Sequence, residues 1–232
     1  MKIVFLGTSS MVPTKKRNHS ATLLLYKDEG ILVDCGEGTQ RQLKFARIKP
    51  SRITKILITH WHGDHVFGLP GLLQTLGSEE YSGTLKIYGP PGSNQIFNNV
   101  MKAFMLETRV DYEIQEVSSG VFFENAEFSL KALPLYHGIP CVGYRFQEKD
   151  TRRILMAKVK ALGVPEGPLL GKIQKGQSII HDGKRIKPEQ ISRLQKGKAV
   201  SFIFDTKLTK NCIALAQDCD LLISESTFAE TH

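Results

Sequence analysis

The chain has 232 residues, 41% of them hydrophobic, which suits one large domain, or one domain with an insertion, around a substantial core. No apolar run approaches the about 20 residues that span a bilayer, and the opening MKIVFLGTSS is too short an apolar stretch for a signal peptide. The net charge of +8 is localised, because residues 145–198 hold 14 Lys/Arg against 5 Asp/Glu while the rest of the chain is nearly balanced. Such a localised excess favours an element that binds a polyanion such as nucleic acid.

Short apolar segments bounded by polar residues or glycine predict strands along the first half of the chain. These strands are expected at residues 2–6, 21–26, 31–33, 53–59 and 85–88. Helices are expected at residues 37–46, 69–76 and 93–106, the last with Ser93 as its N-cap.

The second half begins with consecutive strands, expected at residues 112–117, 121–123, 128–134 and 142–146. Residues 152–162 are predicted to be helical, and residues 163–171, with two prolines and three glycines, to be a loop. A strand at 200–204, a helix at 209–218 with Thr209 as N-cap and a strand at 221–224 follow. This order predicts two mixed sheets covered by helices, an α/β layered architecture.

The segment THWHGDH, residues 59–65, places three imidazoles and a carboxylate directly after an apolar strand. On an extended chain His60 and His62 project to the same side, and a turn at the glycine can bring Asp64 and His65 to a second position. Nitrogen and oxygen donors this close together suit Zn²⁺ or a similar divalent cation. A polar surface loop is the weaker reading, because three neutral imidazoles gain little there.

The four cysteines form no C-x-x-C pair, so we expect free thiols in a reducing compartment and a cytoplasmic protein with no membrane partner. They are Cys35, Cys141, Cys212 and Cys219.

Several longer strings resemble the ribonuclease Z branch of the metallo-β-lactamase superfamily. They are FLGTSS, RNHS, DCGEGTQRQL, THWHGDHVFGLPGLLQTL and YGPPG, and the resemblance runs across essentially the whole chain. It implies an αββα four-layer sandwich with an inserted flexible arm.

The resemblance also implies the metal ligands. One cation would be held by His60, His62, His137 and Asp205, and the second by Asp64, His65 and the same bridging Asp205. Asp34 would orient a ligating imidazole from behind, and Asp64 would also orient the attacking water. Two Zn²⁺ per subunit, or Mn²⁺ in their place, would bind the phosphate and activate that water. Phe204 stands before Asp205 where the family usually has glycine.

The basic segment, residues 148–198, contains GVPEGPLLGKIQKG and resembles the arm with which the family holds the tRNA elbow, one subunit serving the site of the other in a homodimer. A Gly/Pro-rich tip flanked by basic side chains can follow a phosphate backbone without reading bases. The expected tRNA contacts are Gly167, Pro168, Lys172, Lys175, Lys184, Arg185 and Lys187. A plain solvated insertion is the alternative.

Residues 221–228, LLISESTF, match a late motif whose glutamate is Glu225 here. The family continues with a His-Ser/Thr motif, whose histidine pairs with that glutamate and assists the leaving group, and with a further metal-binding histidine. The resemblance therefore implies that the C-terminal part of the fold is missing and that the second metal site is weak. His232 is not expected to substitute. A shortened chain is favoured over a degenerate homologue or a longer natural product.

We therefore expect a metal-dependent endoribonuclease that removes the 3′ trailer from precursor tRNA, with Asp64 and Glu225 as its catalytic residues. One alternative is an enzyme of the same fold acting on a small phosphodiester or sulfate ester, which would not need the basic arm. Another is an inactive form that only binds tRNA. A zinc-stabilised structural protein fits poorly, because no Cys-rich closed site is present.

Overall fold

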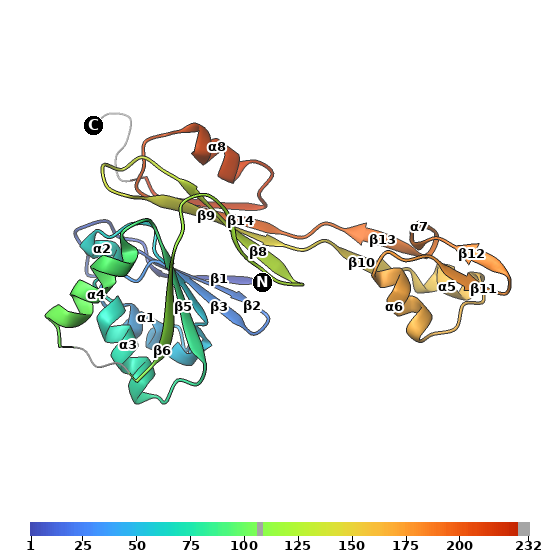
Figure 1. Ribbon diagram of the computed structural model, residues 1–232, viewed down its shortest axis with the longest axis horizontal. Coiled ribbons are helices and arrows are strands. Elements are labelled where there is room, and N and C mark those ends of the chain that lie inside the picture. The colour runs from blue at the N-terminus through green and yellow to red at the C-terminus, as the bar shows by residue number, and fades with distance from the viewer. Residues whose placement is uncertain (106–108, 227–232) are drawn as a thin grey trace.

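The computed structural model describes residues 1–105 and 109–226, in which two β-sheets lie face to face between outer helices (Figure 1). The first sheet has six strands in chain order, antiparallel from β1 to β3 and parallel from β3 to β6. Its strands are β1 (Lys2–Gly7), β2 (Ala21–Tyr26), β3 (Glu29–Val33), β4 (Lys55–Leu57), β5 (Thr84–Gly89) and β6 (Asp111–Glu116).

The second sheet has five strands in the order β15-β14-β9-β8-β7, antiparallel except for the parallel pair β14 and β15. Its strands are β7 (Gly120–Glu124), β8 (Phe128–Pro134), β9 (Val142–Glu148), β14 (Ala199–Ile203) and β15 (Leu221–Ser224).

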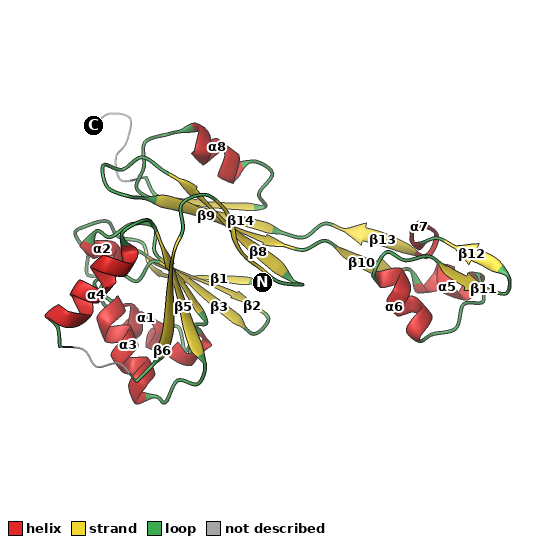
Figure 2. Cartoon of the chain, viewed as in Figure 1, coloured by secondary structure: helices red, strands yellow, loops and turns green. Residues whose placement is uncertain are grey.

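Helices cover the outer face of each sheet (Figure 2). Those over the first sheet are α1 (Thr39–Phe45), the 3₁₀ turn η1 (Pro50–Arg52), α2 (Gly63–Val66), α3 (Leu69–Ser78) and α4 (Ser93–Ala103), and α8 (Lys210–Ala216) covers the second. Thr209 is the N-cap of α8, as the sequence predicts, and its side chain accepts a hydrogen bond from the Cys212 amide. The αββα prediction is confirmed.

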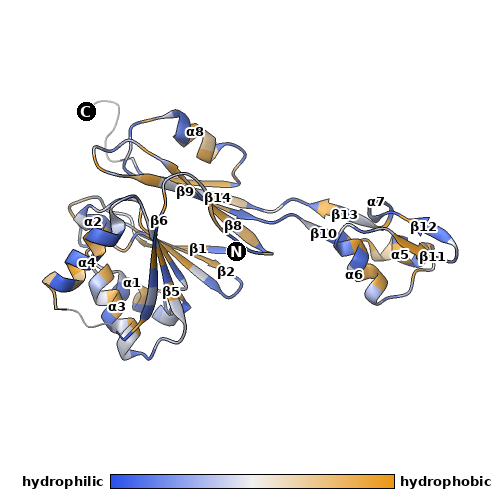
Figure 3. Cartoon of the chain, in the orientation of Figure 1, coloured by the Kyte–Doolittle hydropathy of each residue, from blue (hydrophilic) through white to orange (hydrophobic). Residues whose placement is uncertain are grey.

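Apolar residues occur along the strands of both sheets (Figure 3), and the core has two layers because successive side chains of a strand point to opposite faces of its sheet. In β2, Leu23 belongs to the cluster beneath α1, α3 and α4, whereas Leu24 belongs to the cluster between the sheets. Tyr144 on β9 lies in that inter-sheet cluster, and its hydroxyl donates to the Ile58 carbonyl at 2.7 Å. This hydrogen bond therefore links the two sheets just beyond the C-terminal end of β4.

The basic segment forms a small unit that projects away from both sheets (Figure 1). Its elements are β10 (Thr151–Ile154), α5 (Met156–Ala161), α6 (Pro168–Gln174), β11 (Ile179–His181), β12 (Lys184–Ile186), α7 (Pro188–Ile191) and β13 (Ser192–Gln195). Strands β10 and β13 pair antiparallel as a stalk. The unit has its own apolar cluster, which includes Val159, Ile173 and Ile191, each with no exposed surface.

Three local predictions were wrong. Residues 152–154 form β10 rather than helix, because pairing with β13 overrides their local preference. Helix α6 begins at Pro168 inside the predicted loop, with proline at its first position and Ile173 in the arm's core. Ser93 is the first residue of α4 and Gly92 its N-cap, since Gly92 has φ 92° and the Ser93 hydroxyl instead donates to the Pro90 carbonyl.

Two positions named in the predictions cannot be compared with the structure. Leu106, the expected end of α4, and His232 lie outside the described residues. No helix in the described part of the chain combines the length and the apolar character that a membrane span needs.

Candidate metal centre

The predicted ligands come from the segments that follow three strands, so the strand ends of two sheets converge on one point. His60 comes after β4, His137 after β8 and Asp205 after β14. The loops of β4 and β9 are tied together, because the Val142 amide donates to the Thr59 carbonyl at 2.9 Å. The site therefore lies at the strand ends where the two sheets approach each other.

The local chain explains how four neighbouring residues reach this point. His62 has an extended backbone, with φ −72° and ψ 149°, and α2 begins at the next residue. That change of direction brings Asp64 and His65 back beside His60, whose ring centroid lies 4.1 Å from that of His65. The turn expected at Gly63 is thus one short helix.

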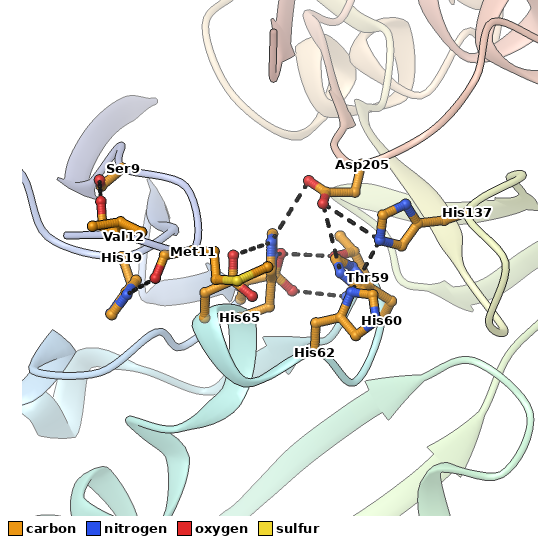
Figure 4. Close-up of polar contacts among 12 residues, drawn as sticks. Ser9, Met11, Val12, His19, Thr59, His60, His62, His65, His137 and Asp205 are labelled. Carbon is orange, nitrogen blue, oxygen red and sulfur yellow. Dashed lines mark hydrogen bonds and ion pairs between the residues drawn. The ribbon is translucent and has the colours of Figure 1, made fainter. Parts of the chain in front are cut away.

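The side chains gather in two overlapping groups, and Figure 4 shows the first of them together with His65. In the first group, donor atoms of His60, His62, His137 and Asp205 lie within 4.8 Å of one another. The second group consists of His65, Asp205 and Glu225, within the same limit.

Asp205 belongs to both groups, and its two oxygens point to different partners. Oδ2 lies 3.4 Å from His137 Nε2 and 4.0 Å from His60 Nε2, whereas Oδ1 lies 3.7 Å from His65 Nε2. His62 Nδ1 is 3.0 Å from His137 Nε2. Asp64 is placed beside the second group, with Oδ2 3.6 Å from His65 Nε2. Asp205 thus has the geometry of a bridging ligand.

Asp34 supports the cluster from a fully buried position. Its Oδ1 accepts from the Thr59 amide at 2.8 Å, and its Oδ2 accepts from the Thr59 hydroxyl at 2.8 Å and contacts His65 Nδ1 at 2.7 Å. Thr59 Oγ1 is also 3.1 Å from His60 Nδ1. Sequence reasoning did not single out Thr59, although its place directly before His60 was the available signal.

Three buried polar atoms indicate that the cluster can bind a cation. Among the described residues, His60 Nε2, His65 Nε2 and Asp205 Oδ1 are the buried side-chain nitrogen and oxygen atoms without a hydrogen-bond partner. An unsatisfied buried polar group costs about 1–3 kcal/mol, so three around one point require a compensating ligand. Imidazole nitrogens and carboxylate oxygens are donors that suit Zn²⁺. The residues present fit a divalent metal site.

The pKa values divide the histidines by their surroundings. Burial, with the neighbouring His65, lowers the pKa of His60 to about 3, so its imidazole is neutral and able to donate a lone pair. Burial also opposes the charge on His65, but the carboxylate of Asp34 outweighs it and raises the pKa to about 9. Burial lowers the pKa of His137 as well.

Glu225 lies next to Asp205, and the two carboxyl groups differ in pKa. Burial and a hydrogen bond to Asp205 raise the pKa of Glu225 to about 8. Burial disfavours the charge on Asp205, yet the hydrogen bond from Glu225 and the field of His65 lower its pKa. Of the two carboxyl groups, Asp205 is therefore the more readily ionised.

The predicted tRNA contacts lie in the arm and not in the cluster. Gly167 is the N-cap of α6 and Pro168 begins that helix. All seven predicted contacts are exposed: Gly167, Pro168, Lys172, Lys175, Lys184, Arg185 and Lys187. The arm leaves the body after β9 and returns before β14, at the ends of these strands opposite His137 and Asp205. The arm root and the metal centre are thus separated by the length of β14, about 17 Å for five residues.

Two other histidines have structural contacts. His19 is buried, with Nε2 3.1 Å from the Met11 carbonyl. His181 is half-buried, and its Nε2 lies 2.9 Å from the Gly163 carbonyl, closing the turn after α5.

Known proteins are similar to this chain in both sequence and fold. Ribonuclease Z of Methanothermobacter thermautotrophicus is 40% identical over 228 residues, which are 98% of this chain and 74% of that protein. Ribonuclease Z of Bacillus subtilis is 39% identical over 239 residues, with 99% and 77% covered. Human tRNase Z, short form, superposes with a TM-score of 0.72 at 29% identity, covering 100% of this chain and 80% of that one.

A family model described as Anti-Pycsar protein Apyc1 matches residues 1–140. That match contains His60–His65 and His137 but ends before the arm and Asp205, whereas the ribonuclease Z relatives match nearly the whole chain. The chain therefore belongs to the ribonuclease Z family of the metallo-β-lactamase fold, and its first 140 residues share the Anti-Pycsar protein Apyc1 family model.

Proposed function

We propose that this protein is a metal-dependent endoribonuclease that removes the 3′ trailer from precursor tRNA. The observation that carries the proposal is the convergence of His60, His137 and Asp205 from three separate strand ends on one cluster, in a chain 40% identical to a ribonuclease Z over 98% of its length. Hydrolysis of a phosphodiester is the chemistry that such a cluster serves.

We infer two Zn²⁺ per subunit, with Mn²⁺ as a substitute. His60, His62, His137 and Asp205 would hold one ion. His65 and Asp205 would hold the second, with Asp64 and the carboxyl group of Glu225 beside them. Divalent cations supply Lewis acidity to a phosphodiester and to an attacking water.

Two carboxyl groups have positions suited to proton transfer. Asp64, with 12% of its side chain exposed, lies at the mouth of the cluster and can accept a hydrogen bond from the attacking water. Glu225 lies beside Asp205 and His65, where its carboxyl group can take part in proton transfer to the leaving oxygen. General acid–base help of this kind contributes about 10²–10⁴-fold.

The arm supplies the tRNA-binding surface in this proposal. Its seven predicted contacts are exposed, and its charge excess suits a phosphate backbone. Because the arm root and the metal centre lie at opposite ends of β9 and β14, a homodimer in which one subunit's arm presents tRNA to its partner's site fits the geometry. A cytoplasmic location fits the free cysteines Cys35, Cys141, Cys212 and Cys219.

The test is incubation with a precursor tRNA that carries a 3′ extension, in the presence of Zn²⁺ or Mn²⁺. We expect one cut on the 3′ side of the acceptor stem, mapped by sequencing the products. Hydrolysis of bis(p-nitrophenyl) phosphate without any cut in the precursor would instead assign a small phosphodiesterase. Tight binding of the precursor with neither activity would assign a tRNA-binding protein.

A further inference from the structure

Two cavities open on the metal cluster from different sides. One, of about 600 Å³, is lined by His137, Asp205 and Glu225, together with Tyr136 and Lys207. The other, of about 500 Å³, shares none of these residues. It is lined by His62, Asp64, Gly63, Phe67, Met11, Pro13, His19 and Glu37. In Figure 4, Met11 and His19 lie on one side of the cluster and His137 and Asp205 on the other.

An exposed aromatic ring stands at the second cavity. Phe67 directly follows α2, the helix that carries Asp64, and 67% of its surface is exposed. Its ring packs on Gly63, where an added Cβ would lie 2.2 Å from a ring carbon. Met11, 76% exposed, adds a second apolar side chain to the same cavity. An apolar surface is thus presented to solvent beside a predicted metal ligand.

A second exposed aromatic ring stands at the first cavity. Tyr136 directly precedes His137 and is 58% exposed. Two backbone contacts fix it against the loop of Asp205: the Lys207 amide donates to the Tyr136 carbonyl at 3.0 Å, and the Tyr136 amide donates to Thr206 Oγ1 at 3.0 Å. The Lys207 ammonium lies 5.2 Å from the centre of the ring. The two loops that carry metal ligands therefore also carry a ring and a cation.

Neither ring is accounted for by the protein's own core. Exposed aromatic rings beside a hydrolytic centre suit flat, unpaired nucleobases, which stack on aromatic side chains without regard to sequence. A lysine ammonium beside such a ring, on the loop that carries Asp205, suits a backbone phosphate of the bound strand.

We propose that Phe67 and Tyr136 are the stacking surfaces for the two nucleobases that flank the scissile phosphate, one ring for each base, with Lys207 on the adjoining backbone phosphate. The strand is thereby splayed across the cluster with its phosphodiester over Asp205. This inference rests on the proposed function, because it takes an unpaired RNA strand as the substrate.

The experiment compares Phe67→Ala and Tyr136→Ala with the unchanged chain on three precursor tRNAs. One is intact, one is abasic at the nucleotide before the cut, and one is abasic at the nucleotide after it. Each stacked base contributes enough that loss of its ring lowers kcat/KM about tenfold. We expect each variant to lose its defect on one abasic substrate only, and the two variants to respond to different substrates. Zinc content per chain is expected to match that of the unchanged chain.

Two further variants serve as controls. Phe67→Tyr keeps a ring and is expected to restore kcat/KM, whereas Phe104→Ala, which removes a ring 63% exposed at the end of α4, is expected to change nothing. Equal defects of Phe67→Ala and Tyr136→Ala on all three substrates, or suppression of both defects by the same abasic position, would overturn the proposal. If no precursor is cleaved, the proposed function fails, and the same comparison made on dissociation constants still decides whether the rings stack on these bases.

Discussion

His65 Nδ1 lies 2.7 Å from Asp34 Oδ2, and both side chains are fully buried. With Nδ1 engaged by this carboxylate, Nε2 is the nitrogen that faces Asp205, at 3.7 Å from Oδ1. The backbone of Asp34 adopts the left-handed conformation, φ 57°, as the chain leaves β3. The contact therefore fixes both the position and the ring orientation of a candidate ligand.

Replacing Asp34 by alanine should weaken metal binding about 10–100-fold, the usual effect of losing a group that orients a ligating imidazole. The loss is expected because His65 would be free to rotate and Thr59 would lose both its acceptors. Zinc affinity measured by competition with a chromophoric chelator checks the prediction. Asp28→Ala, an exposed carboxylate in the turn between β2 and β3, is the matched control and should bind as the unchanged chain does.

A bound cation should stabilise the fold, because it satisfies three buried polar atoms that otherwise lack partners. At a hundredfold excess of Zn²⁺ over its dissociation constant the gain is about 2.7 kcal/mol, or roughly 5–10 °C in Tm for a domain of this size. Calorimetry with and without a chelator measures it. His60→Ala should abolish the difference, and a chelator-insensitive Tm in the unchanged chain would contradict the metal site.

The basic side chains of α6 and the turn after it should contribute to tRNA affinity without base specificity. Lys172→Ala combined with Lys175→Ala should weaken binding of any tRNA and flatten the slope of log K against log salt by about 0.7–0.9 for each lost phosphate contact. A titration of labelled tRNA at several salt concentrations gives that slope. The matched control, Lys44→Ala with Lys102→Ala, removes the same charge from exposed positions on α1 and α4 and should leave the slope unchanged.

Removal of the arm should separate tRNA binding from hydrolysis. Thr151 and Gln195 are paired across the stalk, so residues 152–194 can be replaced by an Asn-Gly turn that joins these two residues. Because the arm has its own apolar cluster, the body should stay folded and its zinc content should be unchanged. Affinity for tRNA should disappear while hydrolysis of bis(p-nitrophenyl) phosphate persists. Undiminished tRNA affinity would remove the arm from the account.

The sequence predicts the part of the site that is local in the chain. His60, His62 and His65 lie within one strand end and one short helix, so their spacing alone indicates a metal cluster. Asp205 comes from a different sheet, and only resemblance to a family indicated that it would meet them. The buried bond network of Asp34 with Thr59 depends on side-chain packing that no spacing reveals.

The fold, too, is predictable from the sequence where it is local in the chain and not where it depends on distant segments. Short apolar segments predict the strands of both sheets, and residues 21–26, 128–134 and 221–224 match the observed strands. The helix predicted from residue 152 is wrong at its start because β10 forms only through its pairing with β13, some forty residues further along the chain. The family relationship reaches the arm, but local preferences do not determine whether residues 152–154 form helix or strand.

The central claim is that one metal cluster cleaves the 3′ end of precursor tRNA. Its most direct test is the single-turnover rate of cleavage as Zn²⁺ is titrated into chelator-treated protein, with bound zinc measured in the same samples. The account predicts a rate that rises with zinc occupancy, and no cleavage by His62→Ala at any zinc concentration. Cleavage at full rate in the presence of the chelator, or a fully zinc-loaded protein that leaves the precursor intact, would contradict it.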